Sequence, residues 1–251
     1  NQGAYVSGSS CELMAIAIHA AVLHTAREHG QVLIGCTDLT QAFDRCNRAG
    51  IIERCSEIGV TGKHIRMIID GLLHSKMHIG YEGVYGQLQE VLQGLPQGDN
   101  ESGNLFNLYT RLPVLECNRR LPLLLKPDAA EPRERLNMAK SQYSDDSTSL
   151  TISIPDTRRM FNLDQGHMGN LNFDMNAPKS SVSVYSRSAA RRDRVRQQLR
   201  EHPIMLSRAA VPTKQIWNFL GIYCDFDKAD FSRVHFDRKC DVFTGLAHVL
   251  K

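Results

Sequence analysis

The first long apolar segment of the chain has a helical period and recognisable ends. Ser9 and Glu12 have the spacing of a capping box, which places Ser9 at the N-cap of a helix. Apolar residues follow at helical spacing from Leu13 onward, and Gly30 is typical of a helix C-terminus. These signals predict one helix that ends at Gly30.

Alternating β-favouring residues predict strands, and three of them adjoin acidic residues. Gln31–Thr37 is rich in β-branched and apolar residues and is followed by Asp38. Ser141–Ile154 predicts two short strands with Asp145 and Asp146 at the bend. Other strands are predicted at Met77–Tyr81, Val84–Val91, Ser181–Tyr185 and Ile216–Phe226.

Helical segments alternate with these strands. They are predicted at Asn47–Ile58, from Thr61, around Leu105–Leu112, from an N-cap at Asp156 to Gly166, at Arg187–Arg200 and at Asp237–Lys251. Loops are predicted at Gly94–Gly103 and Pro127–Arg135. Because the order is mixed and the strands are mostly antiparallel, we expect an α+β fold.

The amino-acid composition excludes several classes of protein but does not indicate a function. The 251 residues are 42% apolar and 23% charged, which excludes a wholly disordered chain and collagen. The longest apolar stretch is too short to span a bilayer, so no membrane partner is expected. Seven cysteines without a CxxC pair favour buried thiols in a reducing compartment, the nucleus or cytoplasm, and argue against zinc. The chain begins at Asn1, and we expect it to be a fragment or processed piece.

Positive charge is concentrated near the end of the chain. Residues 1–186 carry 17 basic and 20 acidic residues, whereas residues 187–251 carry 13 basic and 7 acidic ones. A basic surface can face a phosphate backbone. Charge alone equally favours a solvated face on the Arg187–Arg200 helix, and both interpretations stay open.

The three acidic positions that adjoin strands are candidates for metal binding. If their strands are neighbours in one sheet, Asp38, Asp145 and Asp146 reach the same edge. Clustered carboxylates repel unless a cation neutralises them, and hard oxygen ligands favour Mg²⁺. Two such ions about 4 Å apart can hold the attacking and leaving oxygens of a phosphoryl transfer. Taken singly, an Asp-Asp pair is more often a turn or a helix cap.

Six segments follow one another along the chain: NQGAYVSGSS at its start, TDLTQAFDR at Thr37–Arg45, GLPQGDNESGNLFNLY at Gly94–Tyr109, YSDD at Tyr143–Asp146, LNFDMNAPKS at Leu171–Ser180 and WNFLGI at Trp217–Ile222. In this order they resemble the fingers segment before the first long helix and motifs A, B, C, D and E, the last being the primer grip. Together they resemble the reverse transcriptase domain of non-LTR (LINE-type) retroelements.

The resemblance implies a right-hand polymerase palm with an antiparallel sheet and packed helices, partial fingers and the start of a thumb. It divides one reverse transcriptase domain into partial fingers (1–30 and 47–93), palm (31–46 and 94–215), a primer-grip hairpin (216–236) and the start of the thumb (237–251). The remaining fingers and thumb, and an endonuclease region, are expected in a longer parent chain.

The resemblance also implies roles for individual residues. Two Mg²⁺ ions, with Mn²⁺ as a substitute, would be held by Asp38, Asp145, Asp146 and the Leu39 carbonyl. Phe43 would exclude a 2′-hydroxyl from the incoming nucleotide, although core packing is an alternative for this ring. The other implied roles are template and nascent-pair contact for Gln97 and Gly98, proton donation to pyrophosphate for Lys179, and the primer-grip turn for Phe219, Leu220 and Gly221.

The sequence departs from the family pattern at positions that bear on activity. Asp99 follows Gln97-Gly98 where a small residue is usual, Gly103 replaces a proline, and Ser9 stands where an arginine is common. The implied function is RNA-directed DNA polymerase with an RNA template, a DNA primer and deoxynucleoside triphosphates. We expect weak activity from the isolated chain.

Telomerase and group II intron enzymes share motifs A to E, but AFDR and LFNLY favour the LINE type over them. Two other functions remain alternatives. A catalytically inactive scaffold with the same fold could bind RNA, and loss of any of the three aspartates would favour it. A viral RNA-dependent RNA polymerase is the other, but YSDD, Phe43 and the PQG sequence argue against it.

Overall fold

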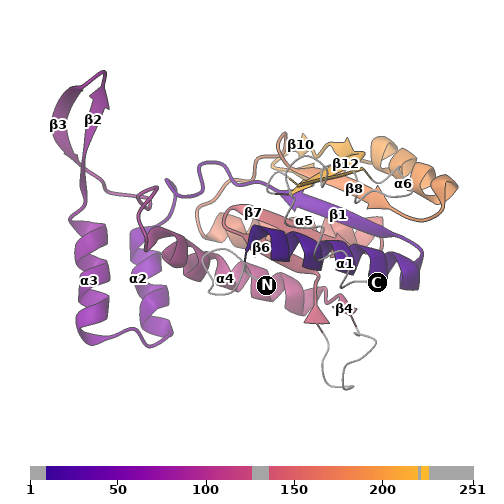
Figure 1. Cartoon of the computed structure of the whole chain (residues 1–251), viewed down its shortest axis with the longest axis horizontal. Helices are drawn as coiled ribbons and strands as arrows, with labels where there is room; N and C mark the ends of the chain where they lie inside the picture. The colour runs from indigo at the N-terminus through magenta and orange to yellow at the C-terminus, as the bar shows by residue number, and fades with distance from the viewer. Residues whose placement is uncertain (1–9, 126–135, 220–221, 226–251) are drawn as a thin grey trace.

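A five-stranded sheet forms the centre of the computed structural model, which describes residues 10–125, 136–219 and 222–225. The strand order is β11 (Thr213–Lys214), β8 (Ser181–Tyr185), β1 (Val32–Thr37), β7 (Asp146–Thr151) and β6 (Lys140–Tyr143) (Figure 1). Neighbouring strands are antiparallel except for the parallel pair β11 and β8. The α+β prediction is therefore confirmed.

The central strand β1 is apolar on both faces because helices cover the sheet from both sides. Leu33 packs in a core with residues of α4 (Ser102–Arg120), α5 (Ile154–Asn170) and α6 (Ala189–Glu201). Val32 and Ile34 point to the other face, where they pack against α1 (Cys11–His29). Alternate side chains of a strand point to opposite faces, so one short segment contributes to two cores.

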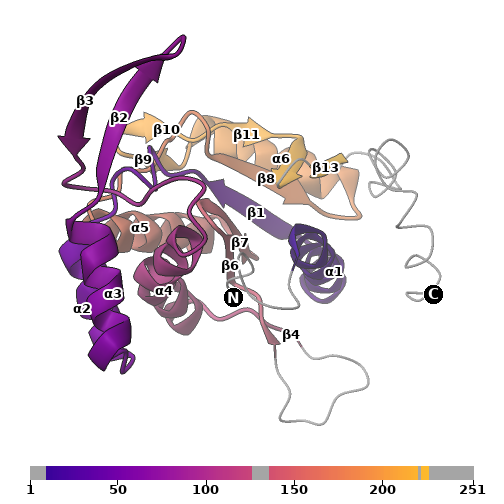
Figure 2. The ribbon, with the colours of Figure 1, turned by 60° about the vertical axis from the view of Figure 1, so that its left-hand side comes forward.

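The segment between β1 and α4 extends from one side of the sheet. It contains α2 (Arg48–Glu57), α3 (Gly62–Leu73) and the antiparallel hairpin of β2 (Lys76–Tyr81) and β3 (Val84–Glu90). The hairpin projects from the body of the molecule as a two-stranded ribbon (Figure 2), and every residue of both strands is exposed. These four elements were predicted, and the structure confirms them.

Short strand pairs complete the fold. β4 (Leu124–Leu125) pairs with β5 (Leu136–Asn137), and β9 (Met205–Leu206) pairs with β10 (Ala209–Ala210). The single strand predicted at Ile216–Phe226 is wrong: β12 (Ile216–Phe219) pairs antiparallel with β13 (Ile222–Asp225) as a hairpin. The loop predicted at Pro127–Arg135 and the helix predicted at Asp237–Lys251 fall outside the described residues, at residues 127–135 and 237–251.

Two predicted helix caps are shifted. The amide of Leu13 donates to Ser10 Oγ at 3.2 Å, so Ser10 rather than Ser9 caps α1. Ser153 rather than Asp156 caps α5: its hydroxyl accepts from the Asp156 amide at 3.2 Å and donates to the Asp156 carboxylate at 2.6 Å. In both places the polar residue that caps the helix lies one to three residues before or after the predicted one, and it accepts from the amide three residues further on.

Two expectations from composition can be examined in the described part of the chain. No helix in residues 10–125, 136–219 or 222–225 has both the length and the apolar character needed to cross a membrane. The five cysteines whose side chains are described are free thiols: Cys11, Cys36, Cys46, Cys55 and Cys117.

Candidate active site

The sheet brings the predicted acidic residues to one edge. In the antiparallel register of β1 and β7, the last pair is Thr37 with Ser147; Asp38 directly follows Thr37, and Asp146 directly precedes Ser147. Asp145 stands in the tight turn between β6 and β7, in which Ser144 has a φ of 56°. The strand ends beside these three residues therefore lie next to one another in one sheet, although more than a hundred residues separate Asp38 from the other two. Their role in metal binding stays a prediction.

The three carboxylates interact electrostatically. Burial raises the pKa of Asp146 to about 6, with further contributions from the charges of Asp145 and Asp38. Burial also raises the pKa of Asp38; the nearby charge of Lys179 and a hydrogen bond from Asn176 oppose this increase, while Asp145 adds to it. Repulsion among partly buried carboxylates is the situation that a bound cation relieves.

The donor chemistry fits a hard divalent cation. Among the described residues, no three His, Cys, Asp or Glu side chains lie close enough together to hold one ion by themselves. Mg²⁺ commonly takes only one or two protein carboxylates and completes its shell with water and substrate phosphates. The carboxylates at the sheet edge are consistent with that kind of incomplete protein shell, and the Leu39 carbonyl as a further ligand stays a prediction.

A loop from the LNFDMNAPKS segment supports the end of β1. Leu39 forms an isolated antiparallel bridge with Met175, and the Asn176 amide donates to the Asp38 carbonyl at 2.8 Å. Ser180 Oγ accepts from the Asp38 amide at 3.2 Å. Asn176 and Ser180 were not predicted as site residues, although both lie in the LNFDMNAPKS segment that contains Lys179.

Lys179 is exposed, and it lies close enough to Asp38 for its charge to oppose the rise in the pKa of that carboxyl. Its backbone amide donates to Asn176 Oδ1 at 3.3 Å, which fixes the turn that carries it. The structure thus brings Lys179 to the same edge as the carboxylates.

The loop before α4 exposes Gln97 and Gly98 at the surface. Gly98 has a φ of 89°, which L side chains rarely adopt, but a Cβ at this position would meet no atom within 4 Å. Within this chain, glycine at position 98 is therefore favoured by the backbone conformation and not by a lack of space for a side chain. Asp99 accepts from Ser102 Oγ at 3.3 Å, so its unusual side chain bonds locally at the start of α4.

Phe43 is half-buried and its ring stacks on Phe106 of α4, with centroids 4.8 Å apart and an interplanar angle of 15°. The ring therefore has the core contact that was the alternative for this residue. A sugar-gate role for its exposed part stays a prediction.

The predicted primer grip is partly described. Phe219 ends β12 and pairs with Ile222 of β13, so the chain reverses direction between them. Leu220 and Gly221 lie outside the described residues. The domain boundaries predicted from the resemblance, including 216–236 and 237–251, stay predictions.

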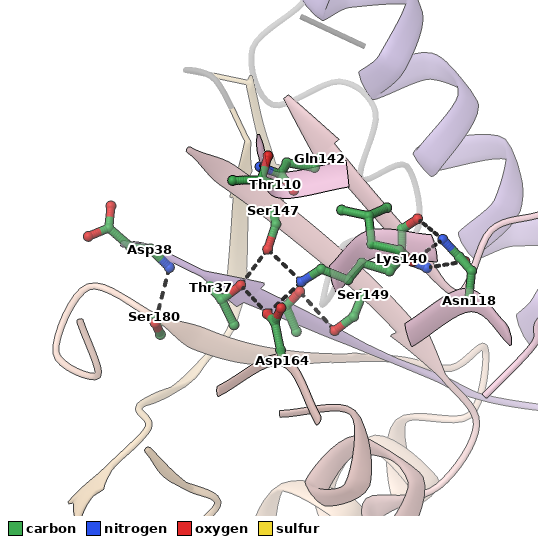
Figure 3. A network of polar contacts seen from close by, with 12 residues as sticks. Thr37, Asp38, Thr110, Asn118, Lys140, Gln142, Ser147, Ser149, Asp164 and Ser180 are labelled. Atoms are coloured by element: carbon green, nitrogen blue, oxygen red, sulfur yellow. Dashed lines mark hydrogen bonds and ion pairs between the residues drawn. The ribbon is translucent and has the colours of Figure 1, made fainter. Parts of the chain in front are cut away.

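A layer of buried polar side chains lies behind the acidic edge (Figure 3). Lys140 of β6 forms an ion pair with Asp164 of α5, with Nζ and Oδ2 2.5 Å apart and both side chains at most 2% exposed. Thr37 donates to the same Asp164 oxygen at 3.0 Å, and Lys140 donates to Ser147 Oγ at 3.0 Å. Sequence reasoning missed this layer because its members come from four separate elements.

The basic helix is confirmed as α6. Val195 and Leu199 are buried, whereas Arg191, Arg194 and Arg200 are exposed. This arrangement suits both a solvated face and a phosphate contact, so nucleic-acid binding by α6 stays a prediction.

Comparisons with known proteins identify the fold. No protein-family model and no curated protein matches the chain. Solved structures do match: apo telomerase from Candida tropicalis truncated from its C-terminal domain has a TM-score of 0.55 at 13% identity, over 89% of this chain and 39% of that one. Apo telomerase from the same species gives 0.55 at 12% identity, covering 92% and 36% of the two chains.

A third match is telomerase from Candida albicans in complex with a TWJ fragment of telomeric RNA, with a TM-score of 0.54 at 11% identity, covering 89% of this chain and 33% of that one. The chain thus spans between a third and two fifths of the length of these structures. At such identities the likeness shows the fold alone, a palm-like fold shared with these telomerase structures.

Proposed function

We propose that this chain, which has a palm-like reverse-transcriptase-related fold, is an RNA-directed DNA polymerase domain of a non-LTR retroelement. It would add deoxynucleotides to a DNA primer on an RNA template. The observation that carries the proposal is the convergence of Asp38, Asp145 and Asp146 at one edge of the sheet. The ordered motifs from TDLTQAFDR to WNFLGI support the retroelement assignment.

The proposed mechanism assigns work to the residues at that edge. Bound Mg²⁺, or Mn²⁺ in its place, would activate the primer 3′-hydroxyl and neutralise charge on the phosphates. Asp38, Asp145, Asp146 and the Leu39 carbonyl would hold the ions. The primer oxygen forms a bond to the α-phosphorus as the bond to the pyrophosphate oxygen breaks. Lys179 Nζ would give a proton to the departing pyrophosphate.

Substrate contacts follow from the loops around this edge. Gln97 and Gly98, exposed before α4, would lie against the template base and the nascent pair. Phe43 would pack beneath the incoming sugar, held from behind by its stacking on Phe106. The hairpin of β12 and β13 would contact the primer end.

Primer extension tests the polymerase proposal. With an RNA template, a DNA primer, deoxynucleoside triphosphates and Mg²⁺, the chain should extend weakly, and Asp145→Asn should abolish extension while leaving RNA binding largely intact. Asp70→Asn is the matched control, because Asp70 is an exposed aspartate on α3 whose pairing with His74 is also exposed. Primer extension that survives in Asp145→Asn would show the metal assignment to be wrong. Efficient DNA synthesis by the unmodified chain would contradict the expectation of weak activity.

The same experiment separates the inactive-scaffold alternative. A scaffold would bind RNA but show no Mg²⁺-dependent extension in the unmodified chain. The presence of all three aspartates, with Lys179 beside Asp38, favours the polymerase.

A further inference from the structure

The strands that carry the aspartates contain few apolar residues. β6 reads KSQY and β7 reads DSTSLT, so Leu150 is the one aliphatic side chain in either strand. Register in a sheet is normally specified by its hydrophobic pattern, and a slip of one residue turns every side chain to the opposite face. In β7 such a slip would put Asp146 in the position of Ser147, or Ser147 in the position of Asp146. Apolar packing specifies this register only weakly.

Directed polar bonds run across the strands at this point. In the antiparallel registers, Thr37, Ser147 and Gln142 lie side by side on β1, β7 and β6. In the adjacent row, Tyr143 of β6 pairs with Asp146 of β7, and Asp38 directly follows the end of β1. Because alternate residues of a strand point to opposite faces, Asp146 and Ser147 lie on opposite faces of β7. The first row therefore lies directly behind the acidic row, one residue inward on each of β1 and β7.

One ion pair joins two members of the polar row, Thr37 and Ser147, to α5. Thr37 Oγ1 bonds both Ser147 Oγ and Asp164 Oδ2, while Lys140 Nζ reaches Ser147 and Asp164 (Figure 3). Thr37 and Ser147 immediately adjoin Asp38 and Asp146 in sequence. A change in the relative position of β1 and β7 would therefore strain or break these bonds as it moved Asp38 relative to Asp146.

A contribution to the free energy of folding does not readily explain why the Lys140–Asp164 ion pair is buried. Lys140 and Asp164 are each about 1% exposed, and desolvation of two charges commonly cancels their attraction. Apolar side chains of similar volume often serve equally well for stability. A directional role accounts for the pair better, because hydrogen bonds specify a single geometry.

We propose that the Lys140–Asp164 ion pair, acting through Thr37 and Ser147, is a positioning device that holds β1 and β7 in the alignment at which Asp38 and Asp146 bind divalent cations together. These four are positioning residues and contact neither metal nor substrate. The inference rests on the proposed metal-binding role of the acidic edge.

The test measures binding of Mn²⁺ alone, by electron paramagnetic resonance titration of the free ion. Replacing both charges in Lys140→Met/Asp164→Leu avoids leaving one buried charge unpaired. We expect the double variant to unfold at an unchanged or higher urea concentration yet bind Mn²⁺ roughly tenfold to hundredfold more weakly, the range seen when groups that orient metal ligands are removed. In primer extension, kcat should fall by a similar factor while KM for the nucleotide changes little.

A matched control lies on the same strand and helix. Thr151 of β7 and Thr157 of α5 are buried and joined by a 2.6 Å hydrogen bond at the opposite end of β7 from Asp146. Thr151→Val/Thr157→Val removes a polar link between the same two elements, and it should leave Mn²⁺ affinity unchanged.

A second pair of variants covers the case in which the double variant fails to fold. Thr37→Val keeps the side-chain shape but removes the bridging hydroxyl, whereas Thr37→Ser retains it. We expect weakened Mn²⁺ binding in Thr37→Val and near-normal binding in Thr37→Ser. Equal binding in Thr37→Val and the unmodified chain would overturn the proposal, as would unchanged binding in a folded double variant.

Failure of the proposed function gives a different result. If the unmodified chain binds Mn²⁺ through Asp146, as judged by loss of binding in Asp146→Asn, but extends no primer, the polymerase proposal fails and the positioning proposal is decided by the Mn²⁺ data. If Asp146→Asn binds Mn²⁺ as well as the unmodified chain does, both proposals fail.

Discussion

Replacing Arg48 should destabilise the chain by an amount that the structure allows to be worked out. Arg48 is 4% exposed at the start of α2, and its guanidinium donates to the carbonyls of Gly94, Leu72 and Val91. It therefore connects the loop before α4 to the end of α3 and the segment after β3. Arg48→Met keeps most of the aliphatic stem and removes every donor.

The cost follows from the carbonyls left behind. Leu72 keeps a bond from Ser75 Oγ at 3.2 Å, whereas Gly94 and Val91 have no second donor among the described residues. Each buried group left unsatisfied costs about 1–3 kcal/mol. Arg48 Nη2 itself has no hydrogen-bond partner in the described structure, so removing an incompletely bonded buried cation offsets part of that cost. We expect the free energy of unfolding to fall by about 3 kcal/mol.

Urea denaturation followed by circular dichroism measures this change, with Arg54→Met as the matched control on the same helix. Arg54 forms a partly exposed pair with Glu57 at 2.6 Å, so its loss should cost about 0.5 kcal/mol or less. A loss below about 1 kcal/mol for Arg48→Met, or one equal to that of Arg54→Met, would refute the reasoning about buried carbonyls.

Three other predictions concern the site. Phe43→Ala should raise the incorporation of ribonucleotides relative to deoxynucleotides in primer extension, and unchanged selectivity would remove the sugar-gate role. In metal-free buffer the pKa of Asp146 is raised to about 6, so the folded state binds the Asp146 proton more tightly than the unfolded state does. The ionisation of Asp146 therefore lowers the free energy of unfolding as pH rises from about 4 to above 6. At pH 8 the Asp146→Asn variant should therefore be more stable than the unmodified chain by about 1 kcal/mol, after allowance for solvent screening, whereas at pH 4 it should not be more stable. Urea titrations at pH 8 and pH 4 check this, and an equal stability difference at the two pH values would contradict it. Finally, Gly94→Ala should lower the thermal midpoint more than Gly98→Ala: both have positive φ, but a Cβ at Gly94 would lie 2.8 Å from the Asp44 carbonyl oxygen, whereas one at Gly98 would meet nothing within 4 Å. Equal midpoints for these two variants would show that backbone conformation alone sets the cost.

Local signals in the sequence determined most of the elements. The strands around Ile34 and Val182, the hairpin turning at Gly83 and the basic helix α6 were all predictable, because alternation, helical periodicity and turn residues act over a few positions. The acidic residues could also be chosen from sequence, since each adjoins a predicted strand. Their common edge followed only on the condition that those strands were neighbours in the sheet.

Tertiary structure alone decided which side chains complete the site. Whether Ser9 or Ser10 caps α1 depended on a turn, and the hairpin at Ile216–Asp225 depended on a chain reversal inside an apolar run. The ion pair of Lys140 with Asp164 had no local sequence signal, because its members belong to β6 and α5 and meet only when α5 packs on the sheet. Periodicity specifies which face of an element is buried; only the packed fold specifies which buried polar groups meet there.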